Sequence, residues 1–115
     1  DENNLEQAKH FLTPLVEETN DIQIQNIASS RLARIALSEK KISEARALIS
    51  TLEKDDGGER FNELKGDLLV AEENFSAARV AYLAALEKSE NASLRREIIL
   101  LKLSNLPTNR EDDNS

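Results

Sequence analysis

Few residues of this chain have the types and spacing that catalysis requires. The single histidine, His10, stands without a second histidine, and the 115-residue chain contains no cysteine. Metal sites are built from groups of such residues, and a catalytic histidine needs a nucleophile or an orienting partner. We therefore expect His10 to be a half-exposed helix residue rather than a metal ligand or a catalytic base.

Carboxylates are plentiful, but their placement does not suggest an acid–base pair. Adjacent residues of a helix point about 100° apart, and a carboxyl group that acts as an acid needs an apolar pocket. The Gly57-Gly58 pair lacks the lysine and the preceding strand of a phosphate-binding loop. We predict that the chain is not an enzyme and uses no cofactor. The paired carboxylates fall in expected turns or at helix and chain ends: Glu17-Glu18, Asp55-Asp56, Glu72-Glu73 and Asp112-Asp113.

The overall charge argues against two classes of partner. The chain has 22 acidic and 15 basic residues, a formal net charge of −7, and no cluster of basic residues. Nucleic acids and anionic lipid surfaces both attract proteins mainly through lysine and arginine. The longest apolar run, Ile98–Leu101, is far shorter than the roughly 18 residues that a membrane span needs. We expect protein partners, and contact with a membrane only through an anchor outside this sequence.

Apolar residues recur every three or four positions in six segments, which is the pattern of amphipathic helices. Pro14 is expected to kink or fray the first helix, and Pro107 to end the last one. Residues 108–115 are polar and acidic and are expected to be disordered. The predicted fold is all-α, with one domain over residues 1–107. The expected helices cover residues 5–18, 22–38, 43–53, 59–71, 76–88 and 92–105.

The helices form an internal repeat. Four pairs of similar residues are separated by 33 positions, namely Ile42 and Phe75, Ala45 and Ala78, Ile49 and Tyr82, and Leu52 and Ala85. This period is close to the 34 residues of tetratricopeptide units, in which small residues allow two antiparallel helices to approach closely. Residues 22–53 and 59–88 are therefore predicted to be two complete repeats. Residues 5–18 match the second helix of a truncated repeat, and residues 92–106 match a capping helix.

The last predicted helix carries two apolar stripes where an end cap should have a polar outer face. One stripe contains Leu94, Ile98 and Leu101, and the other contains Ile99, Leu103 and Leu106. A helix buried deeply against the preceding repeat is favoured over an exposed docking strip.

A binding surface is expected where the first helix of each repeat would line a groove. A groove with mixed charged and apolar residues suits an extended or helical peptide. The alternative is a solvated face that binds nothing. The candidate partner-binding residues are Ile27, Ser30, Arg34 and Leu37 in one repeat, Arg60, Glu63, Asp67 and Val70 in the next, and Ile99 and Leu103 in the closing helix.

Three short strings, in order, resemble the C-terminal part of the YfgM-like family: residues 30–34 (SRLAR), 63–69 (ELKGDLL) and 102–106 (KLSNL). That family comprises tetratricopeptide ancillary subunits of the SecYEG translocon in Gram-negative bacteria. The resemblance implies a periplasmic repeat domain, anchored to the inner membrane by a single N-terminal span that this chain lacks. It also implies association with the translocon and with a PpiD-like periplasmic chaperone during protein export.

Two other functions are compatible with the sequence. The apolar closing helix and the half repeat could pair between copies, which would make the chain a module for homodimerisation or larger assembly. The repeats could also serve as a cytoplasmic adaptor for a regulator. All three hypotheses describe a non-catalytic protein–protein interaction scaffold.

Overall fold

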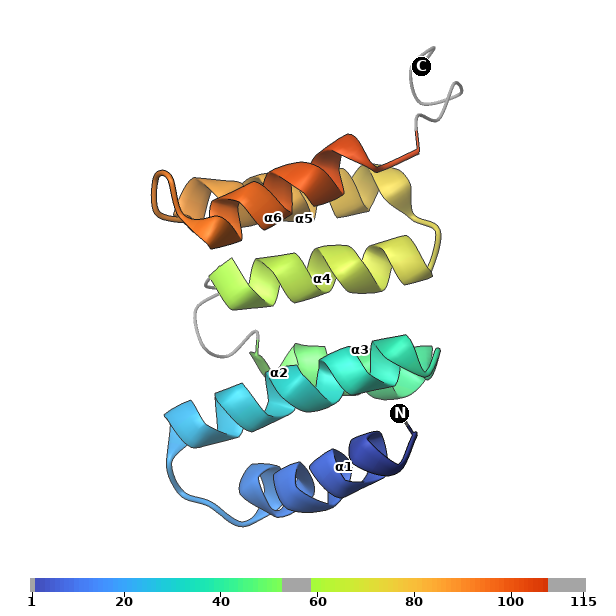
Figure 1. Cartoon of the computed structure of the whole chain (residues 1–115), viewed down its shortest axis with the longest axis vertical. Coiled ribbons are helices and arrows are strands. Elements are labelled where there is room, and N and C mark those ends of the chain that lie inside the picture. Colours follow the sequence, from blue (N-terminus) through green and yellow to red (C-terminus); the bar gives the residue numbers. More distant parts are fainter. Residues whose placement is uncertain (1, 53–58, 108–115) are drawn as a thin grey trace. The chain divides into compact units, whose positions relative to one another are not determined.

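The computed structural model describes residues 2–52 and 59–107, and these residues form six helices (Figure 1). No strand occurs in this described part, so the predicted all-α repeat fold is confirmed. The chain divides into two compact units, residues 1–57 and 58–115, each of which is described by itself below. The predicted Asp55–Gly58 turn and the acidic tail lie outside the described residues.

The first unit contains α1 (Glu2–Glu17), α2 (Ile22–Ser38) and α3 (Ile42–Leu52). Asp21 caps α2, because its carboxylate accepts hydrogen bonds from the backbone N–H groups of Gln23 and Ile24 at 2.9 and 3.3 Å. Small residues are buried along α2, where they allow its neighbours to approach closely: Ala28, Ser29, Ala33 and Ala36.

Pro14 lies inside α1 and does not end it. The helix continues to Glu17, and the N–H group of Glu18 still donates to the Pro14 carbonyl at 2.8 Å. Proline removes only its own N–H donor from the helix. Nearby, the Thr13 hydroxyl donates to the Lys9 carbonyl at 2.8 Å. The fraying expected from the sequence is therefore not seen, since α1 extends one turn past the proline.

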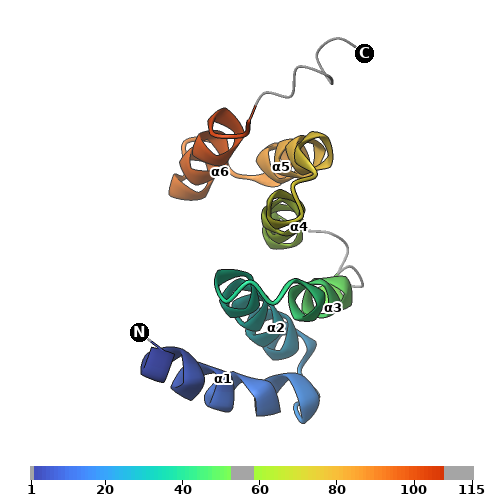
Figure 2. The same cartoon turned by 90° about the vertical axis from the view of Figure 1, so that its right-hand side faces the viewer.

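The second unit contains α4 (Glu59–Ala71), α5 (Phe75–Lys88) and α6 (Leu94–Ser104). Figure 2 shows these three helices nearly end-on, with α6 beside α5. Asn74 caps α5 and Ser93 caps α6 through side-chain oxygens. The core of the unit joins α5 to α6 through five buried residues: Ala78, Tyr82, Ala85, Ile99 and Leu106.

The two apolar stripes of α6 have different environments. Ile99 is fully buried, and Leu103 packs against the same core. In contrast, Leu94 and Leu101 expose 76% and 61% of their surface. The favoured expectation of a deeply buried helix therefore holds for one stripe only, because α5 covers α6 from one side.

Both complete hairpins turn with the same backbone motif. After α2, the N–H groups of Lys40 and Lys41 donate to the carbonyls of Leu37 and Ala36 at 3.1 and 2.8 Å. After α4, Glu73 and Asn74 donate to Val70 and Leu69 at 2.9 and 2.8 Å. This is the Schellman pattern, which places one residue in the left-handed region. Lys40 and Glu73 occupy that position, with φ of 62° and 61°.

We expect Lys40→Gly and Glu73→Gly to stabilise their hairpins. Glycine enters the left-handed region without the steric penalty of a Cβ atom, which is of order 1 kcal/mol. Each variant should therefore raise the free energy of unfolding by up to about 1 kcal/mol in urea titrations. Glycine at Ala47, an exposed position inside α3, is the control and should lower stability by a similar amount. Destabilisation by both turn variants would contradict the assigned role.

Within residues 2–52 and 59–107, none of the helices combines the length and apolarity that crossing a bilayer demands.

Candidate protein-interaction site

Four of the predicted binding residues lie on α2, in the first unit. Ile27 is exposed, whereas Arg34 and Leu37 are half-buried. Ser30 is buried, and its hydroxyl donates to the Ile27 carbonyl at 2.8 Å within the same helix. The Ser30 side chain is therefore buried among the packed helices. The sequence led us to expect it on the partner-binding surface, and it does not lie there.

The other predicted residues lie in the second unit, and only some of them reach the surface. Arg60 on α4 is exposed, and Val70 is half-buried against the core. On α6, Leu103 is half-buried and Ile99 is fully buried against α5. Ile99 therefore holds α6 in place and is not available for docking. That the α2 and α4 residues line a common groove stays a prediction.

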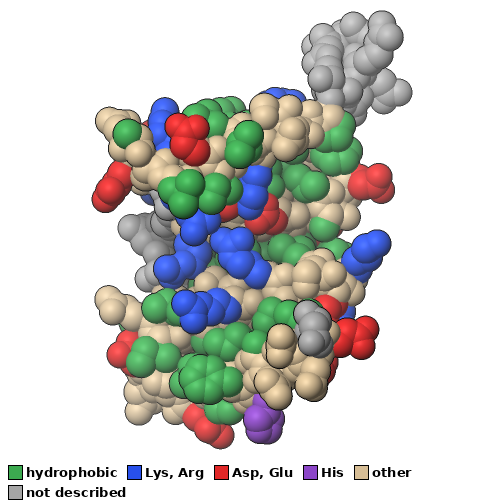
Figure 3. Space-filling view, in the orientation of Figure 1, with side chains coloured by type: hydrophobic (Ala, Val, Ile, Leu, Met, Phe, Trp, Pro, Cys, Tyr) green, Lys and Arg blue, Asp and Glu red, His purple; other side chains and the backbone are tan. Residues whose placement is uncertain are grey.

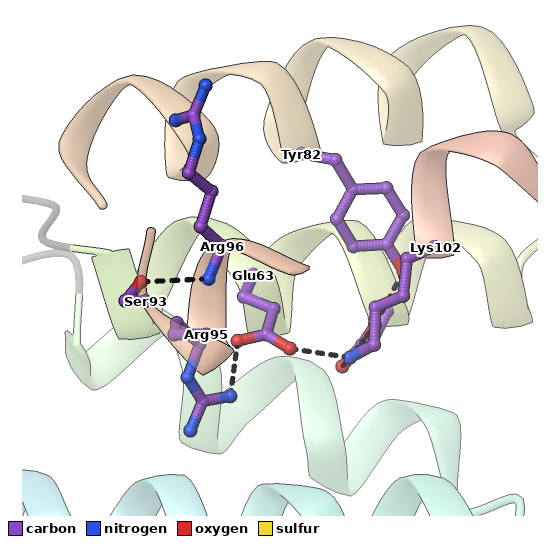
Figure 4. A network of polar contacts seen from close by, with 7 residues as sticks. Glu63, Tyr82, Ser93, Arg95, Arg96 and Lys102 are labelled. Carbon is purple, nitrogen blue, oxygen red and sulfur yellow. Dashed lines mark hydrogen bonds and ion pairs between the residues drawn. The ribbon is translucent and has the colours of Figure 1, made fainter. Parts of the chain in front are cut away.

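Glu63, predicted to face a groove, is instead the centre of an ion network inside the second unit (Figure 4). Its side chain is only 1% exposed. One carboxylate oxygen accepts from Arg95 Nη1 and the other from Lys102 Nζ, both at 2.7 Å. A buried carboxylate of this kind requires cationic partners. Glu63 therefore connects α4 to α6.

Asp67 extends the same network towards α5. Its carboxylate accepts from the Tyr82 hydroxyl at 2.5 Å and from Lys102 Nζ at 3.0 Å. Lys102 thus bridges two carboxylates that lie one turn apart on α4. Replacing Asp67 by lysine would remove the acceptor of a buried tyrosine and place two cations together, so that substitution would disturb the fold as well as any binding surface.

Burial and the Asp67 carboxylate raise the pKa of Tyr82 above its ordinary value. A tyrosine with a raised pKa stabilises the fold fully below its unfolded pKa of about 10, and this contribution is lost as pH rises beyond it. Tyr82 is the single tyrosine of the chain, which has no tryptophan, so tyrosinate absorbance reports this side chain alone.

We expect tyrosinate to form in one step with loss of helical circular dichroism, well above pH 10. A titration near pH 10 with the helices intact would contradict the burial of Tyr82. The Tyr82→Phe variant, followed by circular dichroism, should show a shallower fall in stability at alkaline pH.

A second ion pair connects helices of the first unit. Lys9 Nζ lies 3.0 Å from a carboxylate oxygen of Glu39, which follows α2, and 2.8 Å from Glu6. The hydrogen bond from Lys9 lowers the pKa of Glu39, and Glu6 and Glu39 together raise the pKa of Lys9. These contacts hold α1 against the end of α2, and they leave both charges at the surface.

The described side chains do not form a recognisable catalytic arrangement. One shallow depression is lined by Lys88, Glu90, Ser93 and Arg95, and another by Glu6, Lys9, His10, Thr13 and Pro14. Arg95 and Lys9 are already paired with carboxylates, and His10 is exposed. In the part of the chain with assigned structure, no group of histidine and acidic residues could hold a metal ion.

Sequence reasoning missed the cations that neutralise Glu63. Arg95 and Lys102 are seven residues apart, which places both on one face of α6. That spacing was visible in the sequence. Their partner was not, because Glu63 lies 32 residues from Arg95 and 39 from Lys102.

Two comparisons place the chain among known proteins. The family model of the tetratricopeptide repeat-like domain matches residues 1–108. A protein of Neisseria gonorrhoeae (strain ATCC 700825 / FA 1090), described as an ancillary SecYEG translocon subunit, is 33% identical over 99 residues. The alignment covers 86% of this chain and 47% of that relative, so the chain spans about half the relative's length. No solved structure matches significantly. The resemblance to the YfgM-like family is thereby confirmed.

Proposed function

Because the chain belongs to the family of tetratricopeptide repeat-like domains, we propose that it is a non-catalytic scaffold for protein–protein interaction. Helical repeats of this kind present side chains on an extended surface and recognise partner segments through a few contacts. The exposed apolar side chains of both units support this proposal. They include Phe11 and Ile22 in the first unit and Val80, Leu94 and Leu101 in the second.

We further propose that the scaffold is part of an ancillary subunit of the Sec translocon. The observation that carries this proposal is the 33% identity to the N. gonorrhoeae protein of that description, over most of this chain. The partners would be the SecYEG translocon and a PpiD-like chaperone. The repeats would act on the periplasmic side of the bacterial inner membrane, in protein export and periplasmic chaperoning.

Site-specific photo-crosslinking tests this function. The protein is produced from its complete gene in a Gram-negative host, with a photo-crosslinking amino acid at Ile27, Arg60 or Leu101, all of which are exposed. Recovery of translocon subunits or of a PpiD-like chaperone is the expected result. The buried position Ile99 is the matched control and should give only crosslinks within the protein. Recovery of unrelated proteins alone would contradict the export function.

Homo-oligomerisation is a second candidate, and one observation favours it. Leu94 and Leu101 are seven residues apart on α6 and are both largely exposed, which is the spacing of a helix–helix seam. If copies pair through this stripe, sedimentation should show a mass that rises with concentration. Leu101→Glu should then abolish that rise, and Val80→Glu, at an exposed position on α5, should not.

A further inference from the structure

The exposed face of α2 changes character along its length. Ile24, Ile27, Arg31 and Arg34 follow one another at intervals of three or four residues, so they form one stripe along the helix. Ile24 and Ile27 are 40% and 38% exposed, Arg31 is exposed and Arg34 is half-buried. We call these four residues the α2 stripe. Its first half is apolar and its second half is cationic.

The buried residues Ser29, Ala33 and Ala36 lie on the opposite side of the helix. Ile24, Ile27 and Arg31 therefore stay exposed, whereas Arg34 is half-buried and also makes contacts within the chain. Figure 3 shows apolar side chains gathered over α1 and α2. A helix face that contacts only water does not need isoleucines, because an apolar side chain gains no stability from contact with water.

We propose that the α2 stripe docks a partner segment in which large apolar side chains are followed or preceded by carboxylates. This inference rests on the proposed scaffold function and specifies the partner that the first unit would bind. Charge complementarity carries the choice of occupant. Arginine binds carboxylates through the planar fork of N–H donors on its guanidinium group. The isoleucines of the α2 stripe would then contact the apolar half of the segment, and the arginines would contact its acidic half.

The charge of the whole chain makes this selection sharper. With a net charge of −7, the protein repels acidic segments on average, and a local pair of arginines offsets this repulsion at the α2 stripe. A second copy of the chain is a less suitable occupant. If two α2 helices packed in parallel through this stripe, their arginines would lie next to one another and repel. If they packed antiparallel, the arginines of each helix would face the isoleucines of the other.

Three synthetic helical peptides of about five turns test the proposal. Each has leucines on one face of its first half. The second half carries glutamates on that face in the acidic probe, glutamines in the neutral probe and lysines in the basic probe. Binding of the whole chain is measured by fluorescence anisotropy at two salt concentrations. We expect the acidic probe to bind at least about tenfold more tightly than the neutral one, with a difference that shrinks in high salt.

Variants of the chain assign the binding to the α2 stripe. Arg31→Glu with Arg34→Glu should reverse the order of affinity, so that the basic probe binds more tightly than the acidic one. Ile27→Ser should weaken all three probes. Arg79→Glu, at an exposed position on α5, is the matched control and should change nothing. Because Arg34 also makes contacts within the chain, Arg31→Glu alone is included, and circular dichroism verifies folding.

Equal binding of the three probes, absence of binding, or an unchanged preference in the Arg31→Glu variant would overturn the proposal. Self-association of the chain that Arg31→Glu abolishes would also overturn it, since a second copy would then be the occupant. If the protein crosslinks to the translocon but gives any of these results, the proposed scaffold function would stand and only the docking role of the α2 stripe would be rejected. Selective peptide binding without any translocon crosslink would support the docking site and remove the export function.

Discussion

Replacing both cations around Glu63, by Arg95→Met with Lys102→Met, should lower the free energy of unfolding of the second unit by about 3–5 kcal/mol. The carboxylate of Glu63 is almost fully buried and accepts one hydrogen bond from each cation. The side chains of Arg95 and Lys102 are 44% and 29% exposed, so they can turn to water when Glu63 is absent. Glu63 is buried and cannot turn to water, so losing the positive charges of Arg95 and Lys102 is the costly change.

Urea denaturation followed by tyrosine fluorescence measures this effect, because Tyr82 lies in the second unit. Lys102→Met alone should cost more than Arg95→Met alone, since Lys102 also neutralises Asp67. Adding Glu63→Met to the double variant should recover much of the lost stability, because an apolar side chain needs no counter-charge. Arg79→Met on α5 is the control. Full stability in the double variant would mean that water already solvates Glu63.

Gly66→Ala should destabilise the second unit by about 1–3 kcal/mol, although alanine is the better helix former by about 1 kcal/mol. A Cβ atom on Gly66 would lie 2.6 Å from Cδ1 and 2.9 Å from Cζ of Tyr82. The ring cannot move away easily, because Tyr82 is 2% exposed and its hydroxyl is bonded to Asp67. Gly66→Leu, which adds more volume at the same contact, should cost more.

The first unit supplies the matched test of this contact. At the same 33-residue offset, Ala33 takes the place of Gly66 and Ile49 takes the place of Tyr82. Both are buried. The repeat offset predicts that Ile49 faces Ala33, and isoleucine is smaller than tyrosine, so it would leave room for an alanine. Gly66→Ala should therefore cost less in a Tyr82→Ile background than in the wild type. Additive effects in this double-mutant cycle would show that the two positions do not meet in the way the repeat predicts.

The sequence by itself determined the helices and their pairing. Periodicity predicted the six helices that residues 2–52 and 59–107 form, and the 33-residue offset predicted which helices pair, because spacing along a helix fixes which residues share a face. Element ends were less certain. The structure begins α6 at Leu94 because Ser93 caps it, and such a cap, rather than the hydrophobic pattern, decides where a helix starts.

Only the tertiary structure decided which polar residues face inward. Glu63 and Ser30 have the spacing of a binding surface, yet both are buried, and the cations that make burial of Glu63 possible lie more than 30 residues away. The same holds for α6, where two equivalent apolar stripes became one buried face and one exposed face. Sequence periodicity defines the faces of a helix, but the position of the neighbouring helix determines which face is covered, and that depends on contacts between residues distant in the chain.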